Sequence, residues 1–103
     1  MTELQDRQDI SDLLIRYASG IDRRDWNLFR TVFTPPDCHL DYGEIGGVWN
    51  GVDEVTEFMD VAHAAAGYLM HRISNIVIDL QVDRATTRCY VDAWIMAADN
   101  NSG

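Results

Sequence analysis

Four side chains in this sequence have the types that acid–base chemistry requires: Asp22, His71, Tyr17 and Asp92. A carboxylate beside a histidine forms a general-base pair, because the acid fixes the imidazole tautomer and stabilises its charged form while the ring takes the proton. A tyrosine hydroxyl can polarise a carbonyl or protonate a leaving group. The sequence therefore contains the groups for proton abstraction, but their spacing alone does not place them together.

Three of these residues also have structural interpretations. Asp22 follows a helical pattern, so it could cap the next helix or lie on the surface. His71 could be a hydrogen-bonded strand histidine, and Tyr17 could be a core aromatic. Asp25 is the better helix cap, which weakens the first of these alternatives for Asp22. Arg23, between the two acids, is most simply read with Arg24 as a solvated turn.

Asp92 is harder to interpret because acids are rare in the middle of a strand. Tyr90 and Trp94 share its face in the predicted strand. If that face points outward, Asp92 is an ordinary surface acid. If it points inward, all three residues line a pocket, where a buried acid needs a partner or serves a site.

Composition excludes several functions. The 103 residues carry a net charge of −9, which argues against nucleic acid and against anionic membrane surfaces as partners. All eight basic residues are arginine, so Schiff-base and lysine-base chemistry are excluded. His39 and His63 have no ligand spacing with His71, which predicts no metal and no cofactor. Cys38 and Cys89 form no CxxC pair and no leader peptide is evident, so we expect free thiols in the cytoplasm.

Apolar periodicity predicts the elements that must position these groups. Residues 2–20 read as an amphipathic helix with a Thr2–Gln5 capping box and a stop at Gly20. Further helices are expected from Asp25 to the Pro35–Pro36 pair and within 51–67, the latter closed by Gly67. A short strand, a glycine-rich turn and extended residues occupy 38–51.

The remainder of the sequence predicts a β-hairpin from strands 68–83 and 85–99, joined by a tight turn at Asp83–Arg84. The apolar alternation changes phase near Asn75, which indicates a β-bulge. Helices followed by a meander indicate a single α+β domain over residues 1–103. A curved antiparallel sheet with the first helix along its concave side would form a cone around a pocket. The last strand would be an apolar edge, which predicts a shortened sheet or a homo-oligomer through the sheet.

The ordered motifs of the chain resemble the SnoaL-like group of the nuclear transport factor 2-like superfamily. These are "DISDLLIRYASGIDRRDWNLFRTVFTPPDCHLDY", "GVDEVTEFM" and "MHRISNIVIDLQVDRATTRCYVDAW", which together cover residues 4–98. The resemblance implies a cone-shaped sheet that in relatives continues for two more strands beyond Gly103. It also implies a lyase dyad of Asp22 and His71 assisted by Tyr17, with Asp92 near the position of a further acid.

The function expected from this resemblance is a cofactor-free lyase or isomerase acting on a hydrophobic ring substrate, such as a steroid or polyketide. His71 would abstract a proton, Asp22 would orient His71, and Tyr17 would bind the oxygen that gains charge. The expected substrate-binding residues are Trp26, Phe33, Tyr42, Phe58, Asn75, Tyr90 and Trp94. The alternative is a non-catalytic ligand-binding or dimerisation module of the same fold, and a weaker one is the small subunit of a ring-hydroxylating dioxygenase.

Overall fold

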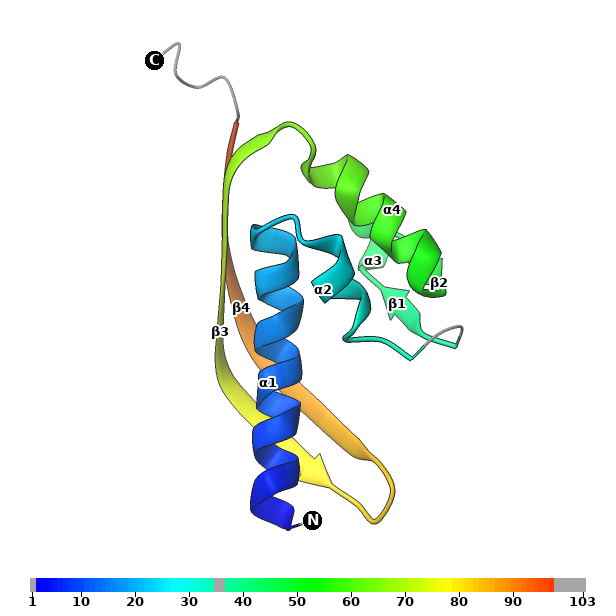
Figure 1. Ribbon diagram of the computed structural model, residues 1–103, viewed down its shortest axis with the longest axis vertical. Coiled ribbons are helices and arrows are strands. Elements are labelled where there is room, and N and C mark those ends of the chain that lie inside the picture. Colours follow the sequence, from blue (N-terminus) through cyan, green and yellow to red (C-terminus); the bar gives the residue numbers. More distant parts are fainter. Residues whose placement is uncertain (1, 35–36, 98–103) are drawn as a thin grey trace.

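The computed structural model describes residues 2–34 and 37–97 as an α+β fold in which helices pack against an antiparallel hairpin, as predicted. The long helix α1 lies lengthwise against the β3–β4 hairpin, and the remaining elements gather on its other side in the view of Figure 1. The elements are α1 (Glu3–Asp22), α2 (Trp26–Arg30), β1 (His39–Asp41), α3 (Gly43–Gly46), β2 (Val48–Asn50), α4 (Val52–His63), β3 (Ala66–Leu80) and β4 (Ala85–Ala97).

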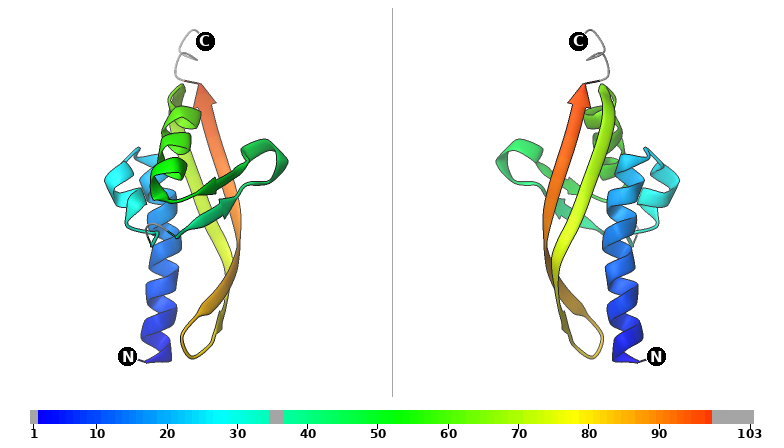
Figure 2. Two further views of the ribbon diagram at one scale, coloured as in Figure 1. Left: turned by 90° about the vertical axis from the view of Figure 1, so that its right-hand side faces the viewer. Right: turned by 90° about the vertical axis from the view of Figure 1, so that its left-hand side faces the viewer.

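The strands form two separate antiparallel pairs, β1–β2 and β3–β4, so the predicted cone is open. Figure 2 shows the long β3–β4 hairpin twisting along its length, with α1 beside it. Sheets twist because of the handedness of the L-peptide backbone, and this twist lets one helix follow the hairpin. None of the helices within 2–34 and 37–97 has an apolar stretch long enough to cross a bilayer.

The beginning of α1 agrees with the sequence and its end does not. The Thr2 hydroxyl accepts a hydrogen bond from the Gln5 backbone N–H, which confirms the predicted N-cap, although the Gln5 side chain donates to Asp9. The predicted stop at Gly20 is wrong, because the helix continues to Asp22. A Cβ at Gly20 would lie 2.9 Å from the Phe29 Cα, so this glycine serves close packing of two helices.

Asp25 caps α2, as predicted: its carboxylate accepts the Leu28 backbone N–H at 3.1 Å. The helix itself ends at Arg30, earlier than expected, and is followed by a turn through Phe33. Pro35 and Pro36, which were expected to end it, lie outside the described residues.

The junction between α4 and β3 differs from the prediction. The helix ends at His63, and β3 already begins at Ala66, so Gly67 is a strand residue rather than a helix stop. Gly67 lies at a shift in the register of the hairpin, between Ala66 and Tyr68. Glycine in a strand often accompanies such an irregularity, because it adds no side chain to the ladder.

The β3–β4 hairpin contains the predicted bulge. Its register shifts between Ser74 and Val77, and Asn75 between them has a φ of 54°. Asparagine tolerates this left-handed conformation better than most residues. The turn is closed by a hydrogen bond from the Gln81 N–H to the Arg84 carbonyl, which confirms the predicted hairpin. The expected strand residues 98–99 lie outside the described part of the chain.

The hydrophobic core lies where the C-terminal end of α1 meets α2, α4 and the start of β3. Its buried members are Ile21, Phe29, Val55, Met59 and Leu69. Phe29 and Val55 are fully buried, and a ring of aromatic side chains packs around them. The core therefore fixes the end of α1 relative to the start of β3, which are the two segments that carry Asp22 and His71.

Candidate active site

Asp22 and His71 are joined by two hydrogen bonds across 49 residues of sequence. Asp22 Oδ1 lies 2.5 Å from His71 Nδ1, and Asp22 Oδ2 accepts the His71 backbone N–H at 2.9 Å. The exposed fractions of the two side chains are 21% for Asp22 and 12% for His71. Both the ring and the backbone of His71 are thus held by one carboxylate at the end of α1.

This geometry fixes the chemistry of the imidazole. A carboxylate only accepts hydrogen bonds, so Nδ1 of the neutral ring carries the hydrogen and Nε2 keeps a lone pair. If Nε2 gains a proton, the adjacent carboxylate stabilises the imidazolium. The arrangement can therefore act as a general base through Nε2.

The ring of His71 has a second histidine beside it, which the sequence did not indicate. The His63 and His71 ring centroids lie 6.4 Å apart with the rings inclined at 62°. His63 Nδ1 lies 2.8 Å from the Met59 carbonyl oxygen at the end of α4, so Nδ1 is its donor. Across the hairpin His71 pairs with Ala93.

Tyr17 lies one turn and a half before Asp22 on α1 and is hydrogen-bonded to Tyr42. The two hydroxyl oxygens are 2.5 Å apart, and burial raises the pKa of both phenols above the ordinary value. In such a pair one hydroxyl donates to the other, and the accepting hydroxyl keeps a hydrogen for a third group. The pair can therefore donate a hydrogen bond to a substrate oxygen while remaining neutral.

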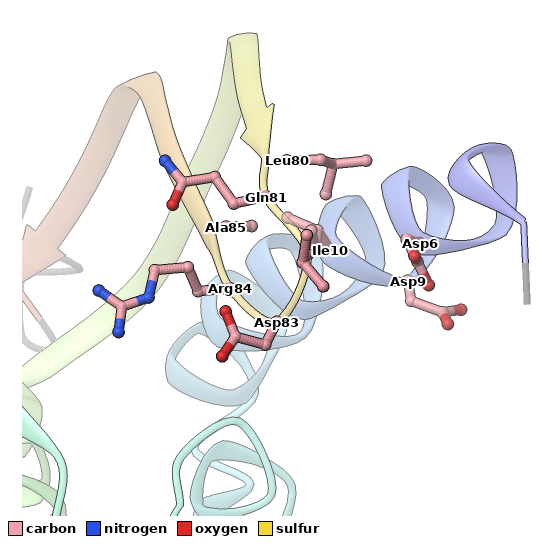
Figure 3. Close-up of a pocket in the computed structure, with 9 residues that line it drawn as sticks. Asp6, Asp9, Ile10, Leu80, Gln81, Asp83, Arg84 and Ala85 are labelled. Carbon is pink, nitrogen blue, oxygen red and sulfur yellow. The ribbon is translucent and has the colours of Figure 1, made fainter.

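An apolar pocket of about 400 Å³ adjoins Tyr17. Its walls come from α1, from the segment after α2 and from the start of β4, and they include Phe33. Asp22 and His71 do not line it. A second pocket, of about 310 Å³, lies between the start of α1 and the tip of the β3–β4 hairpin (Figure 3). Asp6, Asp9 and Asp83 give that pocket an acidic rim, and it contains none of the predicted site residues.

Strand register corrects the predicted positions of Asp92, Tyr90 and Trp94. His71 pairs with Ala93, whereas Asp92 pairs with Arg72, so Asp92 lies on the opposite face of the hairpin from the dyad. Tyr90 and Trp94 share that outer face and are 65% and 53% exposed. Of the two alternatives for this face, the outward one holds.

Three further predicted residues lie outside the pocket. Trp26 and Phe58 pack against the core as partly buried aromatics, and Phe58 stacks on Trp49 with 4.4 Å between ring centroids. Asn75 is exposed at the bulge. Of the expected wall residues, Phe33 lines the pocket and Tyr42 reaches Tyr17, because aromatic type alone does not distinguish a pocket wall from a core.

Arg24 also differs from the sequence interpretation. It is half-buried rather than part of a solvated turn, and its guanidinium donates hydrogen bonds to backbone carbonyls of His63 and Ala66. Its φ of 52° is left-handed, which no sequence pattern here indicated. Within residues 2–34 and 37–97, no cluster of three or more histidine, cysteine or acidic side chains is arranged to hold a metal ion.

Comparison with known proteins identifies the family of the chain. The model of the SnoaL-like domain matches residues 2–103. The chain belongs to the SnoaL-like family. This family is part of the nuclear transport factor 2-like superfamily, as the sequence motifs predicted.

Proteins of known sequence and structure resemble the chain over most of its length. Uncharacterised proteins of Mycobacterium tuberculosis and Mycobacterium bovis are 28% identical over 88 residues, which cover 85% of this chain and 59% of theirs. The chain thus spans less than two thirds of these curated relatives.

Solved structures share the fold. A candidate aromatic ring hydroxylase from Novosphingobium aromaticivorans has a TM-score of 0.84 and 27% identity, covering 96% of this chain and 71% of that one. A candidate scytalone dehydratase from the same species has a TM-score of 0.81 and 21% identity, covering 91% and 62%. A candidate dehydratase of the NTF2-like family from Streptomyces avermitilis has a TM-score of 0.74 and 15% identity, covering 91% and 75%.

Proposed function

We propose that this SnoaL-like domain is a cofactor-free proton-abstracting enzyme, a lyase or isomerase, with Asp22 and His71 as its general-base dyad. The observation that carries the proposal is the pair of hydrogen bonds that the Asp22 carboxylate accepts from the ring and the backbone N–H of His71. The hydrogen bond from the ring leaves Nε2 as the basic atom. Membership in a family with dehydratase-like structural neighbours supports the same class of function.

In the proposed reaction, His71 Nε2 takes a proton from a carbon next to a carbonyl group, and the C–H electron pair moves into an enolate. Asp22 stabilises the imidazolium that forms, and the hydrogen of the Tyr17–Tyr42 pair is donated to the enolate oxygen. The enolate then expels a leaving group with its bonding electrons from the β carbon, or, where the ketone has a β,γ double bond, the dienolate takes the proton back from His71 at the γ carbon. The first outcome is elimination and the second is isomerisation.

The proposed substrate is a hydrophobic ring compound with a ketone, such as a steroid or a polyketide-like molecule. The pocket beside Tyr17 is lined mostly by aliphatic and aromatic side chains, and such pockets suit apolar ligands held by few polar groups. The protein's net charge of −9 is a further reason to propose neutral substrates rather than anionic ones. We also propose a cytoplasmic location, with which the free thiols of Cys38 and Cys89 agree.

Exchange of protons next to a carbonyl with deuterium from D₂O tests the proposal without knowledge of the leaving group. A panel of α-tetralone and 3-ketosteroids is incubated with the protein and followed by proton NMR. Exchange should be catalysed, and His71→Ala should slow it by about 10²–10⁴-fold with the fold intact. His39→Ala is the matched control, because His39 is exposed on β1 and bonded to Asn50. Equal exchange by His71→Ala and the unaltered protein would overturn the assignment.

The second candidate is a non-catalytic ligand-binding or dimerisation module. The observation that favours it is that the apolar pocket contains Tyr17 but neither Asp22 nor His71. The same panel distinguishes the two functions. A binding module would show thermal stabilisation by a ketone, no catalysed exchange, and no effect of His71→Ala on either measurement.

A further inference from the structure

Arg24 occupies an unusual place in the turn after α1. It is half-buried and has a φ of 52°, whereas its neighbour Arg23 is exposed. Non-glycine residues with positive φ are uncommon, and glycine adopts that conformation at no steric cost. The arginine side chain therefore has to be explained by its contacts rather than by the turn.

The guanidinium of Arg24 joins two elements that follow one another in the chain. It donates one hydrogen bond to the carbonyl oxygen of His63, at 3.4 Å, and a shorter one to the carbonyl oxygen of Ala66. His63 is the last residue of α4 and Ala66 the first of β3. A planar guanidinium presents several donors in a fixed fork, and a cation is favoured at a helix C-terminus, so arginine suits this junction.

The same contacts join the chain near one member of the dyad to the chain near the other. Asp22 is two residues before Arg24, and His71 is five residues after Ala66 along β3. We propose that Arg24 is a positioning residue of the Asp22–His71 dyad. By fixing the α4–β3 junction to the end of α1, it sets the separation of the carboxylate and the imidazole.

The two hydrogen bonds of Arg24, called the clamp below, also hold the backbone of His63. The centroid of the His63 ring lies 6.4 Å from that of the His71 ring. The backbone carbonyl oxygen of His63 is one of the two acceptors of Arg24. Loss of the guanidinium frees both the backbone entry into β3 and the histidine beside the base. The role of Arg24 in catalysis rests on the proposed function, whereas its effect on the Asp22–His71 hydrogen bond does not.

Two substitutions separate the clamp from the turn. Arg24→Gln keeps a side chain but removes the charge and the guanidinium fork, and Arg24→Gly removes the side chain while relieving the positive φ. Arg23→Gln is the matched control, since it removes the same charge from the adjacent exposed position. Arg24→Lys restores a cation with a single donor group and is the second variant if Arg24→Gln fails to fold, as judged by circular dichroism.

The first readout is the NMR signal of the His71 Nδ1 proton, which reports its hydrogen bond to Asp22 whether or not the protein is an enzyme. We expect this signal to shift or broaden by exchange with water in Arg24→Gln and Arg24→Gly, to be intermediate in Arg24→Lys, and to be unchanged in Arg23→Gln. The proposal would be overturned if the signal were unchanged in either of these two variants, Arg24→Gln or Arg24→Gly.

The second readout is the ketone exchange assay. A misplacement of about 1 Å at a catalytic group can cost about 100-fold, so Arg24→Gln should lose about that factor in kcat with a much smaller change in KM. If Arg24→Gln had the same kcat as Arg23→Gln, the proposed effect of Arg24 on catalysis would be contradicted. If His71→Ala keeps its exchange activity while the Nδ1 signal responds to Arg24→Gln, the proposed function fails and the positioning role stands.

Discussion

At the scale of single residues, the seven-residue stretch from Gly20 to Trp26 divides into separate roles. Asp25 caps α2, Arg23 is exposed, and Arg24 reaches the α4–β3 junction. Asp22 is left to bind the ring and backbone of His71. Asp22 and Asp25 therefore have unrelated roles, because Asp25 caps the start of α2 whereas Asp22 binds a residue of β3.

The residue types of the dyad could be predicted from the sequence, but several residues that contact or adjoin it could not. Periodicity placed Asp22 just after the first helix and His71 on a strand, and the family resemblance supplied their pairing. Arg24 and His63 gave no signal, because their contacts depend on a positive φ and on where α4 stops. Asp92 was misplaced because, without the strand pairing, the sequence does not say which face of a strand is inward.

The Tyr17–Tyr42 pair predicts how stability changes at high pH. Burial raises the pKa of both hydroxyls in the folded protein, whereas unfolded tyrosines ionise near about 10. The unfolded state therefore binds fewer protons above about pH 10, so the free energy of unfolding should fall as pH rises beyond that value.

Urea unfolding at pH 9 and pH 11 measures this fall. The Tyr17→Phe/Tyr42→Phe variant removes both ionisations and should lose less stability between the two pH values than the unaltered protein. An equal loss in both proteins would show that the pair does not carry the effect.

At the scale of elements, the sequence predicted which segments are helices and strands better than where they end. Apolar stripes are set by the face each element buries, and the stripe predicted for α1 is buried or half-buried from Ile10 to Ile21. The two glycine stops were wrong because Gly20 and Gly67 serve packing and register instead. A glycine marks a place where a side chain does not fit, and tertiary contacts decide whether that place is an end.

Gly20→Ala tests the close contact between α1 and α2. An added Cβ would lie 2.9 Å from the Cα and Cβ of Phe29, closer than carbon atoms pack. Overpacking of this kind costs about 1–3 kcal/mol, which should outweigh the better helix propensity of alanine. Denaturant unfolding should give Gly20→Ala a lower free energy of unfolding than the unaltered protein. Ser19→Ala, in the same helix, should not show this loss. A stabilised Gly20→Ala protein would mean that the helices separate freely.

At the scale of the whole molecule, the β3–β4 hairpin presents apolar side chains on both faces. Its exposed large residues include Tyr90 and Trp94 on the outer face and Val91 and Ile95 on the inner face. This pattern supports the proposal of a homo-oligomer through the sheet, since apolar strands at an edge are normally covered.

Sedimentation of the purified chain measures its size in solution. We expect an oligomer, and Trp94→Asp should shift it toward monomer because a charge would be buried at the outer face. Val82→Asp, at the fully exposed hairpin tip, is the control and should leave the oligomer intact. A monomer at all concentrations would contradict this proposal.

The central claim is that Asp22 and His71 work as one unit, and a double-mutant comparison of ketone proton exchange tests it most directly. Residues that act together are strongly non-additive, so Asp22→Asn/His71→Ala should be about as slow as His71→Ala alone. Each single variant should be far slower than the unaltered protein. Independent losses that multiply in the double variant, or full activity in His71→Ala, would contradict the account.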